Sequence, residues 1–131
     1  MVNLAKARSI TEAAERKAGE IGQPMNIAVV DAGGNLVSHV RMDGAWLGSI
    51  EISINKAYTA RAFDMPTQDL GAESQSGGSL FGINTTNDGR IVIFAGGVPL
   101  REGDEVVGAV GVSGGTVEQD QEVAEAGVAA L

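Results

Sequence analysis

A glycine-rich turn between two short strand-like runs is the feature that most constrains the fold of this chain. Residues 26–31 (N-I-A-V-V-D) read as a buried strand, and residues 36–41 alternate as the second strand of a hairpin. The connecting Asp31-Ala-Gly-Gly-Asn35 is a strong turn signal, because its two glycines and Asn35 tolerate positive φ. Strands joined by so tight a turn pair antiparallel, so the sequence predicts an antiparallel sheet.

Helical patterns precede, separate and follow the strand-like runs. Asn3 is a candidate N-cap for a first helix, which Gly22 and Pro24 end. The other predicted helices cover residues 47–63, 67–75 and 120–131, and the other predicted strands cover residues 90–94, 97–100 and 105–112. This order predicts an α/β (α+β) fold in which an antiparallel sheet of about five strands is flanked by helices. No linker or repeat divides the chain, so one domain is expected over residues 1–131.

The predicted helix at 47–63 has apolar residues on two nearly opposite sides. One side carries Ile50, Ile54, Ala57 and Arg61, and the other carries Ile52, Lys56, Thr59 and Phe63. A helix that is apolar on two sides is usually covered on both. One side should meet the sheet, and the other should meet a ligand or a second copy of the chain. We therefore expect a homo-oligomer.

Charge and composition exclude several classes of function. The net charge of −8 repels phosphate backbones, so a nucleic-acid partner is not expected. The absence of cysteine removes thiolate chemistry, and the single histidine, His39, excludes a metal site built from several histidines. The charged N-terminal segment has no apolar signal core, and no run is long enough to cross a membrane. These features predict a cytoplasmic protein with no membrane partner.

Four ionisable side chains are candidates for catalysis. Asp31 and Asp43 lie in or near the hairpin, and two carboxylates there fit either turn chemistry or acid–base work. Lys56 stands among apolar residues, where a lysine has a lowered pKa, holds an anion or extends to the surface. Asp120 lies on the apolar stripe of the last helix, where it caps the helix, pairs with a cation or acts chemically. We expect Lys56, Asp31, Asp43 and Asp120, together with Arg41, around one pocket.

The turn from Ser113 to Thr116 is a second candidate binding element. Its Ser-Gly-Gly-Thr sequence follows a strand and opens a helix, and free backbone N–H groups at such a position attract anions. The alternative is a tight turn in which Thr116 caps the helix. Ser113, Gly114, Gly115 and Thr116 therefore stand as ligand-binding candidates, with Thr59 on the two-sided helix as a further one.

Several segments together resemble the GlcG/HbpS family, which includes haem-binding uptake proteins and the C-terminal domain of PduO-type proteins. The segments are V-V-D-A-G-G-N-L (29–36), R-M-D-G-A (41–45), K-A-Y-T-A (56–60), F-A-G-G-V-P-L (94–100), V-G-A-V-G-V-S-G-G (107–115) and E-Q-D (118–120). The resemblance covers nearly the whole chain. It implies a profilin-like three-layer α/β/α fold and homo-oligomers. Some relatives are expected to carry histidine near the position that Asn84 occupies here, so a role that needs an imidazole at this position is not expected of this chain.

The resemblance implies haem or a related tetrapyrrole as a ligand. His39, Met42 and Tyr58 are the residues of this chain that can compete as its iron ligands. The first functional hypothesis is therefore a ligand-binding accessory protein, with Arg41 and Met42 near the ligand. The second is an enzyme that acts on a small carboxylate or hydroxy acid through Lys56 and a carboxylate. The third is a structural or sensory partner protein that works through its surface.

Overall fold

Four antiparallel strands form the middle layer of the computed structural model, which describes all 131 residues. The strands are β1 (Asn26–Asp31), β2 (Leu36–Arg41), β3 (Gly97–Glu102) and β4 (Glu105–Ser113), in the order β2-β1-β4-β3. The β1–β2 and β3–β4 pairs are hairpins, and β1 pairs with β4 in the centre of the sheet. The predicted antiparallel sheet is confirmed, with four strands in place of the expected five.

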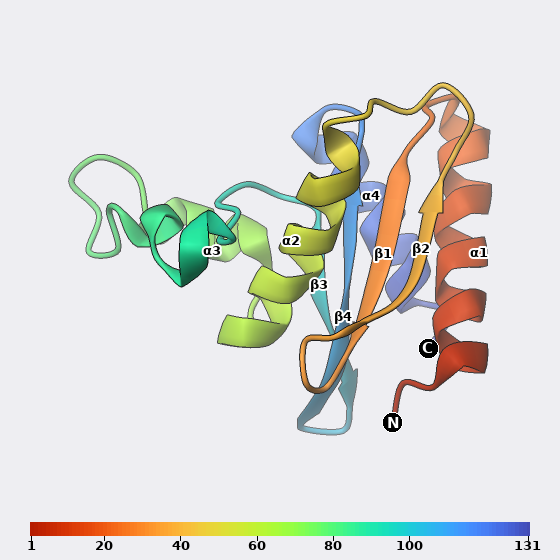
Figure 1. Cartoon of the computed structure of the whole chain (residues 1–131), viewed down its shortest axis with the longest axis horizontal. Coiled ribbons are helices and arrows are strands. Elements are labelled where there is room, and N and C mark those ends of the chain that lie inside the picture. The colour runs from red at the N-terminus through yellow and green to blue at the C-terminus, as the bar shows by residue number, and fades with distance from the viewer.

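Helices cover both faces of this sheet, as the α/β/α expectation requires. Figure 1 shows α1 (Leu4–Ile21) and α4 (Val117–Val128) on one face and α2 (Ser49–Phe63) on the other. Asn3 and Thr116 cap the N-termini of α1 and α4. The Asn3 side chain accepts the Lys6 N–H, and the Thr116 hydroxyl accepts the Gln119 N–H. No helix has both the length and the apolar character that crossing a bilayer requires.

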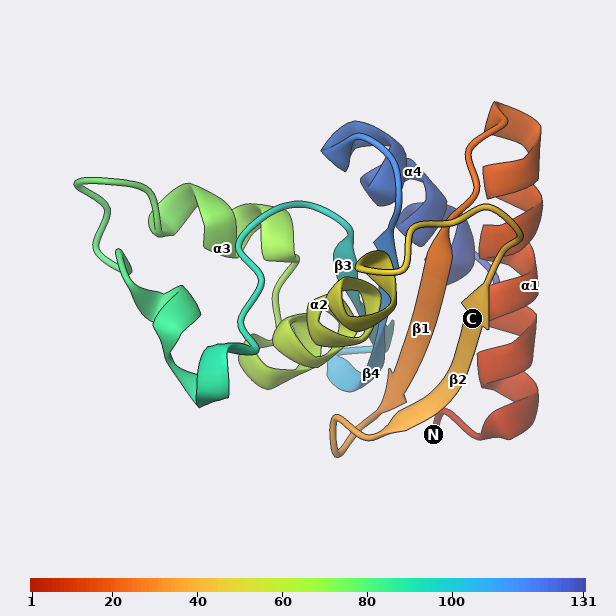
Figure 2. The same cartoon turned by 45° about the horizontal axis from the view of Figure 1, so that its top comes forward.

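The segment after α2 projects away from the three layers. It contains α3 (Thr67–Glu73) and two short 3₁₀ turns, Ile83–Thr85 and Asn87–Gly89, the first of which carries Asn84. Figure 2 shows this segment reaching out beyond α2. Its exposed apolar side chains include Leu80 and Phe81. This projecting segment is the part of the chain least involved in the sheet and its cover.

Residues 90–94 do not form the fifth strand that the sequence predicted. They have no strand partner, and the buried Thr59 of α2 holds them instead. The Thr59 hydroxyl donates to the Arg90 carbonyl oxygen at 3.3 Å and accepts the Val92 N–H at 3.0 Å. The apolar residues of this run therefore pack against a helix, which explains why their pattern imitates a buried strand.

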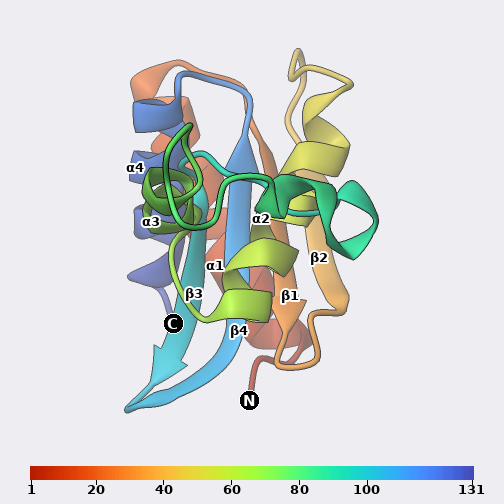
Figure 3. The same ribbon diagram turned by 90° about the vertical axis from the view of Figure 1, so that its left-hand side faces the viewer.

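The two faces of the sheet carry side chains of different size. The face toward α1 and α4 has large aliphatics, whose core includes Ile27, Val29, Val110 and Val112. The face toward α2 has a small cluster built from Ala28, Val30, Ala57, Ala60 and Ala109. Figure 3 shows α2 lying across the sheet on that side. Small residues on both surfaces let the helix backbone approach the strands closely.

The side of α2 that meets the sheet lies between the two apolar sides that the sequence predicted, and it includes Ala57 from one and Lys56 from the other. Fully or almost fully buried positions of α2 are Ser49, Ser53, Lys56, Ala57, Thr59 and Ala60. The isoleucines at 50, 52 and 54, which the sequence suggested as the buried sides, are half-buried. The contact selects small residues because the strand beneath carries Gly111, where the Ser53 carbonyl oxygen leaves no room for a Cβ.

Candidate functional site

Lys56 reaches past the end of β3 and joins α2 to α4. Its ammonium donates to the Asp120 carboxylate at 2.8 Å and to the Val112 carbonyl oxygen at 2.8 Å. The second oxygen of Asp120 accepts the Gly115 N–H at 2.9 Å. Lys56 is completely buried and Asp120 is 3% exposed. One hydrogen-bonded ion pair therefore connects the helix layers that lie on opposite faces of the sheet.

Two glycines make room for this crossing. A Cβ on Gly96 would lie 2.7 Å from the Lys56 ammonium and 2.5 Å from the Val112 carbonyl oxygen. A Cβ on Gly97 would lie 2.5 Å from the Lys56 carbonyl oxygen. Any side chain at either position would displace α2 or its lysine. The Gly96-Gly97 pair thus has a defined role, which is to admit Lys56 between β3 and α4.

Burial pushes both members of the pair toward their neutral forms. It lowers the pKa of the Lys56 ammonium, an effect that the charge and hydrogen bond of Asp120 oppose. It raises the pKa of the Asp120 carboxyl, opposed by Lys56 and by the backbone N–H groups of Gly115 and Gly114. Because Asp120 already neutralises Lys56, the pair offers a bound carboxylate no net positive charge. It can instead exchange a proton internally.

A groove of about 700 Å³ lies next to this pair, between α3 and α4. Its floor includes Phe94 and Ala95, and its walls carry carboxylate and amide side chains. The polar lining residues are Gln68, Gln75, Glu118, Gln121, Glu122 and Glu125. The Phe94 ring centre lies 5.0 Å from the Lys56 ammonium, and Phe94 is 44% exposed. One aromatic ring therefore separates the groove from the buried pair.

Asp31 lies far from that pair, at the other end of the sheet. It pairs with Gly108 of β4, whereas the β1 residue beside Ser113 is Asn26. Its carboxylate accepts the N–H groups of Gly33 and Asn35, at 2.9 and 3.0 Å. The predicted turn is confirmed, with Gly34 at φ +78°. Asp31 therefore acts within its own turn and does not face Lys56.

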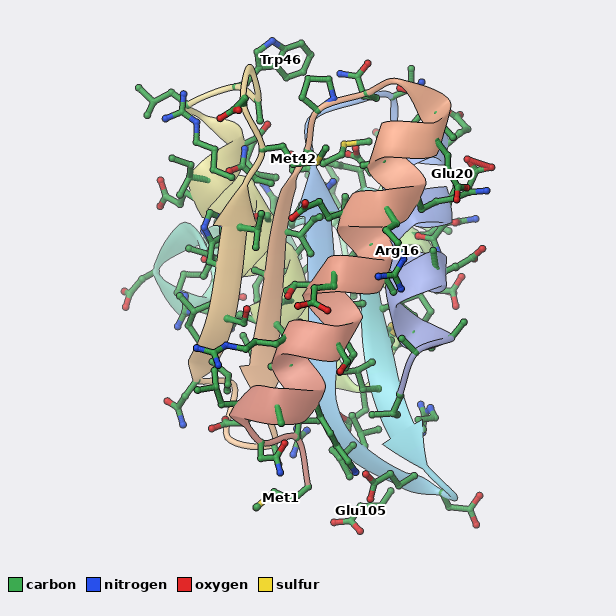
Figure 4. All side chains as sticks on the ribbon, turned by 90° about the vertical axis from the view of Figure 1, so that its right-hand side faces the viewer. Met1, Arg16, Glu20, Met42, Trp46 and Glu105 are labelled. Carbon is green, nitrogen blue, oxygen red and sulfur yellow. The ribbon has the colours of Figure 1, made fainter.

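Arg41, Met42 and Asp43 form a third, separate place on the surface. They line a hollow of about 370 Å³ together with Glu15 and Val40. Arg41 donates to the Ala45 carbonyl oxygen at 3.3 Å, and the Met42 sulfur accepts the Met25 N–H at 3.4 Å. Figure 4 shows Met42 near the end of the sheet beside α1. Within one chain, the five residues expected around a common pocket therefore occupy three places: Lys56 with Asp120, Arg41 with Asp43, and Asp31 by itself.

The Ser113–Thr116 turn uses its polar groups internally. Ser113 donates to the buried Ser49 hydroxyl at 3.1 Å, and the Thr116 N–H donates to the Gln119 side chain at 3.0 Å. Together with the Gln119 N–H, which donates to the Thr116 hydroxyl, the Thr116 bond forms a capping box at the start of α4, and the Gly115 N–H donates separately to Asp120. The N–H groups that suggested an anion site are therefore occupied by the chain's own oxygens.

Of the three haem-ligand candidates, His39 is the one whose side-chain nitrogens make no hydrogen bond. Its Nε2 atom is buried without a partner, and burial lowers the pKa of the imidazole below 6.5. Met42 is engaged as described above. The Tyr58 hydroxyl donates to Asn87 at 3.0 Å, and its ring lies 3.6 Å from the Arg90 guanidinium. His39 is therefore the candidate whose side chain is not already bonded within the chain, and its Nε2 atom is buried in the single chain.

His39 should make the fold less stable at mildly acidic pH. A base whose pKa is lower in the folded state favours the folded state above its ordinary pKa of 6.5, and that contribution is lost as the pH falls through the lowered value. Urea unfolding between about pH 7.5 and pH 5 should show a steeper loss of stability for the wild type than for His39→Gln. Identical pH profiles for the two proteins would contradict this assignment.

Sequence reasoning missed Phe94 and the groove that it lines. Phe94 was placed at the end of a predicted strand, and none of the polar residues that line the groove was among the predicted site residues. One signal was available, because Phe94 is one of five aromatic residues in the chain and directly precedes Ala95 and the Gly96-Gly97 pair. The groove itself depends on how α3 and α4 face each other, which no local pattern encodes.

The whole chain matches a family model described as "Haem degrading protein HbpS-like", over residues 2–129. The chain belongs to the HbpS-like family. A 15.0 kDa protein from the dhaT-dhaS intergenic region of Citrobacter freundii is 49% identical over 95% of this chain and 87% of that protein. The corrinoid adenosyltransferase PduO of Citrobacter freundii is 36% identical over 99% of this chain, which spans 39% of PduO.

Solved structures agree with this HbpS-like membership. Klebsiella pneumoniae protein ORFY superposes with a TM-score of 0.96 at 44% identity, covering 98% of this chain and 89% of that one. A crystal structure described as a PduOC:heme complex superposes with a TM-score of 0.95 at 34% identity, covering 99% and 94%. HbpS of Streptomyces reticuli superposes with a TM-score of 0.88 at 29% identity, covering 99% of this chain and 86% of that one. The expected family and its three-layer fold are confirmed.

Proposed function

We propose that this HbpS-like protein binds haem or a related tetrapyrrole as a small accessory protein, with His39 as the iron ligand. The observation that carries the proposal is the buried Nε2 atom of His39, which has no hydrogen-bond partner. A neutral imidazole with a free nitrogen is the commonest protein ligand of iron and related metals. The haem complex of a relative with the same fold supports the choice of ligand class.

The surroundings of His39 fit a tetrapyrrole in two further respects. Strand alternation places Arg41 on the same face of β2, where its guanidinium can pair with a propionate. The Trp46 ring lies in the loop after β2, is 63% exposed, and projects away from the sheet in Figure 4. The exposed Trp46 ring and the Arg41 guanidinium would supply an apolar and a charged group for haem. Bound haem would contribute redox-active iron.

The large groove beside Phe94 fits haem less well. It contains no histidine, methionine, tyrosine or lysine side chain that could ligate iron. Its three carboxylates, Glu118, Glu122 and Glu125, would repel the propionates of haem. The groove is therefore assigned no role in haem binding, and the proposed site lies on the β2 side of the molecule.

We propose that the chain forms a homo-oligomer, because the sheet edge next to the proposed haem site is open and carries apolar side chains. β2 is an edge strand with β1 as its one partner, so the side of the sheet that carries His39 is not closed by another strand. Half-buried Ile50 and Ile54 lie on α2, the helix that covers this face of the sheet, and Leu36 of β2 is 49% exposed. A second copy placed there would cover these apolar side chains and form the other wall of the ligand site.

Titration with hemin tests the proposal directly. The wild-type protein should develop a sharpened Soret band that saturates at a fixed stoichiometry, and His39→Ala should lose it. Met42→Leu and Tyr58→Phe serve as matched controls that should keep the band, because those side chains are already bonded within the chain. Light scattering on the same samples should give a mass well above the 13.4 kDa of one chain.

Two results would refute the assignment. An unchanged spectrum for His39→Ala would remove the imidazole as ligand, and loss of the band in Tyr58→Phe or Met42→Leu would transfer the role to that residue. A wild-type protein that shows no saturable hemin band would refute haem binding as a whole. The melting temperature of each variant, measured without hemin, shows whether the fold is intact.

A further inference from the structure

Lys56 differs from the other two lysines of the chain in its surroundings. The side chains of Lys6 and Lys17 are 46% and 34% exposed, whereas that of Lys56 is fully buried. Its amine meets one carboxylate, one carbonyl oxygen and one aromatic face. A desolvated lysine beside a group that accepts its proton is a nucleophile toward carbonyl compounds. The haem proposal makes no use of this arrangement.

The groove gives Lys56 a route to solvent that one side chain closes. Phe94 lines the groove, is 44% exposed, and stacks over the ammonium with 5.0 Å between the ring centre and Nζ. It belongs to the segment between the second 3₁₀ turn and β3, which has no regular secondary structure. Rotation of the Phe94 ring toward solvent would connect the groove with the amine without moving a helix or strand.

We propose that Lys56 is a covalent site that forms an imine with a small aldehyde entering through the groove past Phe94. A carbon atom at the Cβ position of Gly96 would lie 2.7 Å from the Lys56 nitrogen and 2.5 Å from the Val112 carbonyl oxygen, so the amine is closed on that side and the aldehyde must approach from the side of Phe94. A small aldehyde is required because Val112, Asp120 and Phe94 surround the amine closely. This inference goes beyond haem binding and does not depend on it.

Asp120 supplies the proton transfers that the reaction needs. It first accepts a proton from the Lys56 ammonium, which frees the nitrogen lone pair. The amine attacks the carbonyl carbon, a C–N bond forms, and a proton moves from nitrogen to the former carbonyl oxygen. Asp120 then returns its proton to the hydroxyl group, which leaves as water while the C=N bond forms. The product iminium keeps the charge of the ammonium and stays paired with Asp120, so no oxidant or reductant takes part.

Reductive trapping tests the proposal on the intact protein. Acetaldehyde with sodium cyanoborohydride converts any lysine imine to N-ethyl-lysine, which digestion and mass spectrometry assign to Lys6, Lys17 or Lys56. The exposed Lys6 and Lys17 act as internal standards in every sample. We expect modification of Lys56 in the folded wild type, at least about tenfold faster relative to Lys6 in Phe94→Ala, and slower in Phe94→Trp.

The result that overturns the proposal is an unmodified Lys56 in both the wild type and Phe94→Ala, while Lys6 is labelled. Equal rates in Phe94→Ala and Phe94→Trp would refute the role of Phe94 in access. If Phe94→Ala melts below the assay temperature, Phe94→Leu takes its place and the same comparison decides. His39→Gln should leave the labelling of Lys56 unchanged, which separates this site from the proposed haem site.

Discussion

Lys56→Met should destabilise the fold by about 3–5 kcal/mol, because it leaves the Asp120 carboxylate buried without its cation. The variant also removes the hydrogen bond to the Val112 carbonyl oxygen. Chemical denaturation at neutral pH measures the loss. A matched control is Lys17→Met, which removes a surface pair with Glu20 at 3.8 Å and should change stability by less than about 0.5 kcal/mol.

The pH dependence of Lys56→Met identifies the mechanism. Burial raises the pKa of Asp120 above its ordinary 3.8, and removal of Lys56 takes away the main opposing effect. A carboxyl whose pKa is higher in the folded state favours folding below its ordinary pKa, and this contribution is lost as the pH rises through the raised value. The loss of stability that Lys56→Met causes relative to the wild type should therefore be smaller near pH 4 than at pH 7. A deficit independent of pH would point to lost packing instead.

Removing both partners should cost less than the two single changes together. In Lys56→Met with Asp120→Leu, no charge remains buried, so the double variant should recover part of the stability that either single variant loses. Additive losses would show that the two side chains stabilise the protein independently. That outcome would contradict the view that the pair connects α2 with α4 as one unit.

Gly111→Val should destabilise the protein by about 3 kcal/mol or more, enough to prevent folding in a marginally stable domain. A Cβ on Gly111 would overlap the Ser53 carbonyl oxygen and lie 2.5 Å from the Ala57 amide nitrogen. Both obstacles are backbone atoms of α2, so the helix as a whole would have to move off the sheet. Thermal melting followed by circular dichroism measures the effect.

Gly19→Ala is the matched control for that variant. Gly19 lies in α1, and a Cβ there would meet nothing within 4 Å. Alanine is favoured over glycine inside a helix by roughly 1 kcal/mol, so the melting temperature should stay equal or rise. Equal destabilisation by the two variants would mean that the contact between α2 and the sheet is looser than the structure shows.

Local chemistry explains which parts of the fold were predictable from the sequence. The Asp31–Asn35 turn, the Asn3 cap and the Thr116 cap each depend on residues within a few positions of one another, and all three appear as predicted. The extra strand at 90–94 was wrong because a buried apolar run looks the same whether a strand or a helix covers it. The bonds from Thr59, which lies 31 positions before Arg90, decide between them.

The sheet-facing side of α2 was hidden for a related reason. The hydrophobic pattern pointed to its isoleucines, but packing against Gly111 and Ala109 selects Ser53, Ala57 and Ala60. The alternation of glycine and alanine with valine along residues 107–112 was the available signal, since one face of that strand carries almost no side-chain volume. A helix that packs closely on such a face needs small residues at the three- and four-residue intervals that bring side chains to the sheet.

The candidate site was predictable in its parts and not in its assembly. Lys56 and Asp120 were both recognised as charged residues at apolar positions, and the structure joins them. Asp31 and Asp43 have the same side chain as Asp120, but Asp31 ends β1 and bonds within its own turn, and Asp43 is exposed in the loop after β2. Nothing in the local sequence distinguishes an aspartate that caps a turn from one that receives a lysine from another layer.

The strand order β2-β1-β4-β3 affects how the chain reaches this structure. Each hairpin joins neighbours in sequence, but more than half of the chain lies between β1 and β4, which form the central pair. Closing so long a loop makes that pairing the slow step of folding. Until it forms, each hairpin exposes the Val-rich inner strand that the native sheet buries. Newly synthesised chains should therefore be most prone to aggregate through β1 and β4, the two strands that are fully protected afterwards.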